Sequence, residues 1–400
     1  MISSLQSSAG ESAVAAGAYK VDISRGERLG RVSSEWFSRP DDERYLSLGA
    51  LHDAVRTRAR RAQTRTVETR QIRVEARRED PERIALLMPG GDEPVAPTHW
   101  SFGQVCGLVG APAGYLRGLP APLAAINLQH GLVAHRGELI KTLETDDGRV
   151  ELRAATGPDY GRIWDHELVA AVMSIAGDGT GDTRWKVPGV LDWGAMTHNP
   201  FVEITKDTTT LYASDRDVFV FLVDDAHPIE AGKLPNGEPD LYFRGFYCWN
   251  SEVGSKTLGI ASFYLRAVCM NRNIWGAEGF QEISIRHSKF AGRRFAHEAA
   301  PALERFANSS TGAFVNGIRA ARQAVVAHND EDRETFLRKR GFTKPETGKI
   351  IATVLDEEGR PPESVFDFVQ GITAYARTKP HQDARLDLEA KAGRLLASVR

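Results

Sequence analysis

The sequence predicts an α+β fold: an antiparallel strand meander, made of a β-hairpin and further strands, packed on helices, with a helical C-terminal third. Strand-like segments follow one another between residues 193 and 268 and are separated by turn residues, which argues against alternating βαβ units. From residue 292 the apolar spacing changes to that of a helix, and the last fifty residues are also helical in pattern.

Local patterns predict the earlier elements in order. A basic helix covers 48–62, a strand covers 64–76, and a second strand within 79–97 ends in a Pro-Gly-Gly turn. Thr98 and Ser101 favour a helix start, and Pro112 limits that helix at its other end. Further elements are a helix at 123–137, a hairpin of 138–145 with 149–156 around Asp146-Asp147-Gly148, and a helix after Ile163.

The chain length suits one large domain or two modest ones. The chain has 400 residues, of which 42% are apolar, so it can bury a sizeable core. We expect a flexible, basic N-terminal arm at 1–64, an α+β core domain at 65–290 and a helical region at 291–400.

Three properties bear on the cellular location. No stretch approaches the roughly 20 continuous apolar residues of a membrane helix, so no membrane partner is expected. The N-terminus lacks the pattern of a secretory signal. Three cysteines do not make a disulfide framework, and the sequence therefore predicts a cytoplasmic protein.

The formal net charge of −2 hides local basic stretches. Residues 56–78 are rich in arginine with only two acids, and residues 286–295 form a second basic cluster. Local stripes matter more than the total for phosphate binding. A solvated face is the alternative interpretation of each stretch.

Motifs for nucleotide or metal chemistry are weak. Gly348-Lys349 would need a glycine at position 343 to form a P-loop, and Thr343 stands there. The cysteines are isolated, and His130 and His135 lie on different faces of a helix, so we expect neither a cofactor nor a metal site. Glu252 and Lys256 lack the Glu-x-Lys spacing of a metal nuclease, although they share one face of a strand.

The cysteines in the strand region are expected to be structural. Cys248 alternates with aromatic residues, and Cys269 ends an apolar run. Neither has a histidine nearby in sequence to lower the pKa of its thiol. The sequence therefore predicts no catalytic residue, and we expect that the protein is not an enzyme.

Basic and aromatic residues occur together on the strands. A groove for a single nucleic-acid strand needs cations along the phosphates and flat rings on which bases stack. Burial in the core is the alternative for the rings. The candidate DNA-binding residues are Arg153, Tyr160, Arg162, Arg244, Trp249, Lys256, Tyr264, Arg266, Arg272, Arg286, Lys289, Arg293 and Arg294.

The polar stretch after Trp249 is interpreted as a structural motif. Asn250 and Ser251 are expected to bond backbone at a strand bend, and Gly254 to permit the turn. Glu252 is expected to pair with Lys256 or with a neighbouring subunit. The later members of this motif are Cys269, which is expected to close the core, and Asn271.

Residues 98–398 resemble a family of phage- and plasmid-borne bacterial proteins catalogued as domain of unknown function nine hundred and thirty-two. The resemblance rests on WNSEVGSKTLGI, FYLRAVCMN, FGQVCGLVGAPAGYLRGLP, LRAATGPDYGRIWDHELV, RHSKF and SVFDFVQGITAYAR. Two positions depart from the family pattern: Thr156-Gly157 where serine is commoner, and Asn271-Arg272 in place of Asn-Gly.

The expected hairpin, meander and helix are also similar to the core of Rad-type single-strand annealing proteins. That resemblance implies a homo-oligomeric ring or filament that binds single-stranded DNA and promotes pairing without ATP, in a phage or plasmid recombination system. The alternatives are a metal-dependent enzyme on nucleic acid that uses Glu252, Asn250 or Cys269, and a structural or regulatory phage protein.

Overall fold

The computed structural model describes residues 39–77, 83–91, 93–134, 138–146, 148–181, 183–187, 204–207, 209–234, 236–266, 283–378, 388, 391–396 and 398–399. These residues form two mainly antiparallel sheets with helices, and the helices are concentrated in the C-terminal part, which confirms the α+β fold. Cys269, Asn271 and Arg272 lie outside the described residues, and so does the side chain of Arg266.

The larger sheet, sheet A, has the order β1-β9-β10-β11-β12-β13, and β8 pairs with β10. Its strands are β1 (Arg44–Tyr45), β8 (Trp185–Lys186), β9 (Leu211–Ala213), β10 (Val218–Lys233), β11 (Pro239–Asn250), β12 (Leu258–Arg266) and β13 (Ile283–Ile285). The neighbours β9 to β12 form the predicted meander, because each pairs antiparallel with the next.

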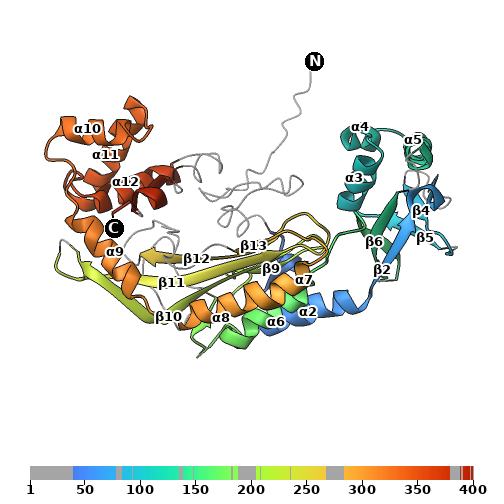
Figure 1. Ribbon diagram of the computed structural model, residues 1–400, viewed down its shortest axis with the longest axis horizontal. Coiled ribbons are helices and arrows are strands. Elements are labelled where there is room, and N and C mark those ends of the chain that lie inside the picture. Colours follow the sequence, from blue (N-terminus) through green and yellow to red (C-terminus); the bar gives the residue numbers. More distant parts are fainter. Residues whose placement is uncertain are drawn as a thin grey trace, which may run out of the picture.

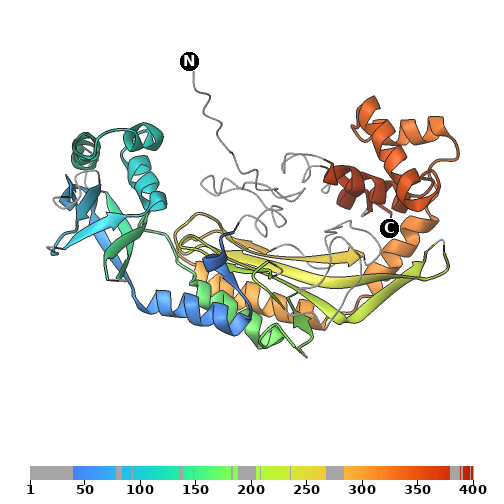
Figure 2. The same cartoon turned by 180° about the vertical axis from the view of Figure 1, so that it is seen from behind.

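Helices cover one face of sheet A (Figures 1 and 2). They are α2 (Leu48–Arg60), α6 (Asp165–Ala176), α7 (Ala291–Arg294), a π-helical turn (Phe295–Ala299) and α8 (Ala300–Asn308). Alternate residues of β10 contribute to the core between sheet and helices, among them Val218, Val220 and Leu222. We call sheet A with these helices the body.

The N-terminal region differs from the predicted flexible arm. Its described part, from Arg39 onward, includes β1 and α2. Leu48, Leu51 and Val55 recur at helical spacing on one side of α2 and are all buried in the body core. Residues 39–60 are therefore an integral part of the body.

Sheet B lies in a separate lobe at one end of the molecule (Figure 1). Its strand order is β2-β6-β7-β5-β4-β3, with β5 and β7 parallel and the other pairs antiparallel. The strands are β2 (Ala62–Glu68), β3 (Arg73–Ala76), β4 (Ile84–Leu87), β5 (Pro94–Pro97), β6 (Leu139–Asp146) and β7 (Val150–Thr156). The helices α3 (His99–Leu108), α4 (Ala113–Arg117) and α5 (Ala121–Ala134) complete this lobe. We call residues 62–156 the inserted lobe, because they stand between α2 and α6 of the body.

The C-terminal helices stand at the opposite end of sheet A from the inserted lobe (Figure 1). They are α9 (Gly312–Gln323), α10 (Asp330–Arg338), α11 (Lys344–Glu358) and α12 (Val365–Arg377), and we call them the C-terminal lobe. Their core is continuous with that of the body through Phe314, which stacks on Tyr264 of β12 with ring centroids 3.6 Å apart. In the part of the chain that the structure describes, no helix is both long and apolar enough to cross a bilayer.

Candidate functional site

The polar motif at the end of β11 lies where the inserted lobe meets the body. Asn250 donates from Nδ2 to the Ile163 carbonyl and to Asp165 Oδ1, both at 2.8 Å. Ser251 donates from Oγ to the Arg216 carbonyl at 2.7 Å. These bonds to backbone confirm the expected role of Asn250 and Ser251. The expected turn at Gly254 is also present, with φ +81°.

Of the two partners expected for Glu252, Lys256 is wrong, because Arg153 pairs with Glu252, and a neighbouring subunit stays a prediction. Its Oε2 accepts from Arg153 Nη1 at 2.9 Å, with only 1% and 4% of the two side chains exposed. Its Oε1 accepts from the Asp165 backbone N–H at 3.0 Å, and Arg162 donates to its carbonyl. The Glu252 carboxylate therefore joins β7 of the inserted lobe to the start of α6.

Lys256 pairs instead with Asp217, at 2.9 Å between Nζ and Oδ2. Arg39 also contacts Asp217, at 2.7 Å, and Ser214 Oγ donates to it at 2.8 Å. Burial alone would raise the pKa of Asp217, but the charges and hydrogen bonds of Arg39 and Lys256 outweigh it and hold that pKa well below its usual range.

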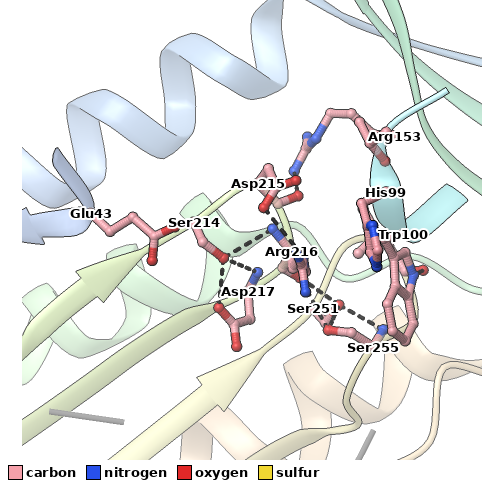
Figure 3. Close-up of polar contacts among 12 residues, drawn as sticks. Glu43, His99, Trp100, Arg153, Ser214, Asp215, Arg216, Asp217, Ser251 and Ser255 are labelled. Atoms are coloured by element: carbon pink, nitrogen blue, oxygen red, sulfur yellow. Dashed lines mark hydrogen bonds and ion pairs between the residues drawn. The ribbon is translucent and has the colours of Figure 1, made fainter. Parts of the chain in front are cut away.

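Two turns of the body meet through serine hydroxyls beside these ion pairs (Figure 3). Ser214 and Asp217 belong to the β9–β10 turn, and Ser251 and Ser255 to the β11–β12 turn. Ser255 donates to Ser251 Oγ twice, from its hydroxyl at 2.9 Å and from its backbone N–H at 3.0 Å. Arg153 also donates to the Asp215 carbonyl at 2.9 Å, so it holds both turns.

Asp165 is the carboxyl at this junction whose pKa is raised. Complete burial is the main cause, and the nearby charge of Glu252 adds to it, while the hydrogen bond from Asn250 opposes both. Its Oδ2 and the Oδ1 of Asn250 have no hydrogen-bond partner among the described residues. A proton on Asp165 removes the repulsion between two buried carboxylates.

The inserted lobe contacts the turn between β11 and β12 directly. Trp100 and Gln104 of α3 both donate to the Val253 carbonyl, at 3.0 and 2.8 Å. The Val253 side chain is buried in a small apolar cluster with Leu143 and Ala154 of sheet B. These hydrogen bonds and the buried Val253 side chain attach the inserted lobe to the body.

Three of the candidate DNA-binding residues, Arg244, Trp249 and Tyr264, are buried. Arg244 donates to the carbonyls of Ser309 and Ala307 at 2.7 and 3.1 Å and thus caps the end of α8. Trp249 lies over Gly259, where a Cβ would stand 1.8 Å from the indole. Tyr264 is held by its stack on Phe314. With Arg153 in its ion pair, these four side chains do not fit the predicted role, because strand periodicity does not tell a core face from a binding face.

Of the remaining candidates, Tyr160, Arg162, Lys256 and Arg294 are partly accessible, and only the backbone of Arg266 is described. The half-buried Arg162 lies 5.3 Å over the Tyr160 ring, and Tyr160 donates from its hydroxyl to the Ser251 carbonyl at 2.9 Å. Lys256 is committed to Asp217. Arg266 lies in β12 opposite Tyr242 of β11. Arg294 pairs with Glu298 at 2.9 Å.

The exposed candidates are Arg286, Lys289 and Arg293, beside the start of α7. Arg56 and Arg60 of α2 are also exposed. They were not among the predicted candidates, although both belong to the arginine-rich stretch 56–78. Within the described ranges, no ion pair holds any of these five cations. Both segments lie at the end of the helical layer nearest the inserted lobe (Figures 1 and 2).

The cysteine expectations agree with the structure where it describes them. Cys248 is fully buried, and burial raises the pKa of its thiol well above the usual range. The buried position expected for Cys248 is thus confirmed. Across the described ranges, no three His, Cys, Asp or Glu side chains gather closely enough to hold a metal ion.

Comparison with known proteins gives no relative: no family model matches the chain, and neither a curated protein nor a solved structure is significantly similar to it. The resemblances drawn from its motifs therefore stay predictions.

Proposed function

We propose that the protein is an ATP-independent single-stranded DNA-binding and annealing protein of a phage or plasmid recombination system, acting as a homo-oligomer in the cytoplasm. The observation that supports it best is a set of exposed cations, none of them in an ion pair with a described residue, at the end of the body nearest the inserted lobe. The recombination context comes from the motif resemblance alone.

The cationic surface consists of Arg56, Arg60, Arg286, Lys289 and Arg293. An arginine or lysine that already pairs with a carboxylate gains little by contacting a phosphate. An unpaired one can bind the phosphate and release counterions that were condensed on the DNA. The close approach of residues 286–294 to the loop before α6 brings the second group of cations to this end, since Gly161 N–H donates to the His287 carbonyl at 3.3 Å. Contacts of this kind position a strand without reading its bases.

The enzyme alternative receives less support. Asn250 and Glu252 are fully buried and committed to backbone and to Arg153, so a substrate cannot reach them in this conformation. Cys269 lies outside the described residues. The third alternative, a structural or regulatory protein, is the outcome if an oligomer without DNA affinity is found.

Fluorescence anisotropy with labelled single-stranded DNA, measured over a salt series, tests the proposal. We expect the variant Arg56→Gln/Arg60→Gln/Lys289→Gln/Arg293→Gln to bind more weakly and to lower the salt slope by about 3, at about 0.7 for each lost phosphate contact. The matched control Lys339→Gln/Lys349→Gln removes two exposed lysines of the C-terminal lobe and should leave the slope unchanged.

Two results would overturn the proposal. One is the lack of single-strand binding by the unmodified protein near about 50 mM salt, where electrostatic binding is strong. The other is a loss of affinity per removed charge that is the same in the two-lysine control as in the four-residue variant, which would mean that only total charge matters.

A further inference from the structure

The outer face of α5 is unusually apolar for a surface helix. Of the nine large apolar side chains that are exposed in the described chain, five belong to the inserted lobe, and three of these lie on α5. They are Leu123, Ile126 and Val133, with 50%, 64% and 58% of their surface exposed. The inner face of the same helix is buried in the core of the lobe. A helix that is apolar all round normally has partners on both sides.

A hollow of about 500 Å³ lies beside this face. It is bounded by Pro122, Ala125 and Ile126 of α5 and by Val74 and Ala76 of β3. Here β3 is an edge strand, but Gln129 of α5 accepts from the Val74 N–H at 2.7 Å and so blocks the addition of another strand at that point. The hollow is thus suited to side chains of a docked helix.

The spacing along α5 is symmetric. Leu123, Ile126, His130 and Val133 form one stripe, and their numbers are placed symmetrically about position 128. When two such helices pack antiparallel about a twofold axis, Leu123 meets Val133 of the second copy, and Ile126 meets His130 of the second copy. Because the spacing of the stripe is the same in both directions along the helix, the stripe can pack against the same stripe of an antiparallel copy.

Charge also favours a second copy over a different protein. No Asp, Glu, Lys or Arg occurs in α5, so the two α5 faces approach without like-charge repulsion, and the one acidic residue that lines the hollow, Glu75, lies on β3. The helix equally lacks the charged residues with which surfaces commonly select a particular foreign partner.

We propose that two copies of this chain associate through the outer faces of their α5 helices, packed antiparallel about a twofold axis. The inference rests on the homo-oligomeric part of the proposed function and names the surface responsible. A twofold contact closes into a dimer, and a ring or filament would build on that dimer through a second, separate contact.

Light scattering and sedimentation of the full chain between about 1 and 200 µM test the association, a range suited to an interface smaller than the standard size. We expect Ile126→Glu to weaken dimerisation at least about tenfold, because each contact then contains two buried carboxylates. The control Leu355→Glu changes an apolar residue of similar exposure, 48%, in the C-terminal lobe and should dimerise normally. A monomeric unmodified protein at every concentration, or equal loss in the control, would overturn the inference.

Cysteine cross-linking tests the antiparallel geometry. The variant Ile126→Cys/His130→Cys should form an interchain disulfide on mild oxidation. The control Leu123→Cys should not, since its two thiols would be about 15 Å apart along the helices at 1.5 Å per residue. Cross-linking of the control but not of the double variant would contradict this arrangement.

DNA binding separates the two proposals. Ile126→Glu leaves the cationic surface intact, so its affinity per chain for a short single strand should stay within about threefold. A dimer without DNA affinity would leave the α5 contact standing and refute the proposed function. DNA binding by a protein that stays monomeric would refute the α5 contact and the homo-oligomeric part of the proposed function, and would leave its DNA-binding part standing.

Discussion

Glu252 and Arg153 carry opposite charges at a place that is almost closed to water. Their 2.9 Å contact compensates for the loss of hydration of both groups, and neither could be buried alone at moderate cost. The pair connects β7 of the inserted lobe to the turn after β11. A change in either residue therefore acts on the attachment of the lobe.

We expect Glu252→Gln to lower the free energy of unfolding by about 3–5 kcal/mol, because the Arg153 guanidinium stays buried without its counter-charge. Urea unfolding measures this loss. Arg153→Met/Glu252→Gln should recover part of it, since the uncompensated charge is then removed.

Glu151→Gln is the matched control for that change. Its partner Arg149 is well exposed, so the loss should be below about 1 kcal/mol. Unchanged stability in Glu252→Gln together with a lost enzymatic activity would instead support the catalytic alternative.

At this scale the sequence predicted types of role better than partners. The backbone bonds of Asn250 and Ser251 and the turn at Gly254 follow from local chemistry, and the structure confirms them. The partner of Glu252 could not be predicted, because Arg153 is 99 residues away in sequence and meets it only through tertiary packing. Local spacing offered Lys256, which Asp217 binds instead.

Among the elements, the loop before α6 and the segment after β13 are held together by His287. Its Nδ1 lies 3.1 Å from the Gly161 carbonyl, and its ring stacks on Tyr160 with centroids 5.0 Å apart. Burial, with a further contribution from the charge of Arg162, lowers the pKa of His287 to about 4, although the bond to Gly161 opposes this. The two segments are therefore joined by a neutral imidazole.

Acid should loosen this contact. The unfolded chain binds a proton at His287 below about pH 6.5, whereas the folded chain does so only near pH 4. The stability that His287 contributes is thus complete above pH 6.5 and falls by up to about 3 kcal/mol as the pH drops toward 4. Urea unfolding at pH 7 and 4.5 should show a smaller pH dependence in His287→Gln.

His328→Gln removes an exposed histidine and is the control; it should keep the pH dependence of the unmodified protein. If His287→Gln also kept it, His287 would not be the group that titrates.

Most elements could be predicted because their signals are local. The helix after Thr98 begins as expected, with the Thr98 hydroxyl accepting from Ser101 N–H at 3.2 Å. The helix α11 lies in the predicted helical region, but its start was not predicted, because TKPETGKII was considered only as a phosphate loop, although Thr343 and Glu346 form a capping box there. The strand predicted at 64–76 is broken by a 3₁₀ turn at Thr69–Gln71, since Thr69 and Ile72 turn inward there.

For the whole molecule, the fold class could be predicted but its division could not. The predicted core domain 65–290 contains most strands of both sheets, and the sequence has no composition change where the chain passes between them. Only the pairing of distant strands separates sheet A from sheet B. The junction between them depends on Val253, which is buried among residues of the inserted lobe.

Val253→Asp should uncouple the inserted lobe from the body, because a carboxylate replaces a methyl group contact in an apolar cluster. Hydrogen exchange should then lose protection at residues 98–104 and 250–256, while the interior strands β6 and β10 keep theirs. Val325→Asp, at an exposed position between α9 and α10 of the C-terminal lobe, should change neither region. Loss of protection throughout would mean that lobe and body unfold as one unit.

The insertion of a lobe between α2 and α6 also has a consequence during synthesis. The helix α2 leaves the ribosome first, but α6, against which it packs, is separated from it by residues 61–164. At a translation rate of about 5–20 residues per second, the apolar side of α2 stays without α6 for on the order of 5–20 seconds. The inserted lobe has its own core and can fold within this interval, which brings the two helices of the body within reach of each other. Slowing translation within the lobe would lengthen the exposure of α2 to chaperones, and speeding it would shorten that exposure.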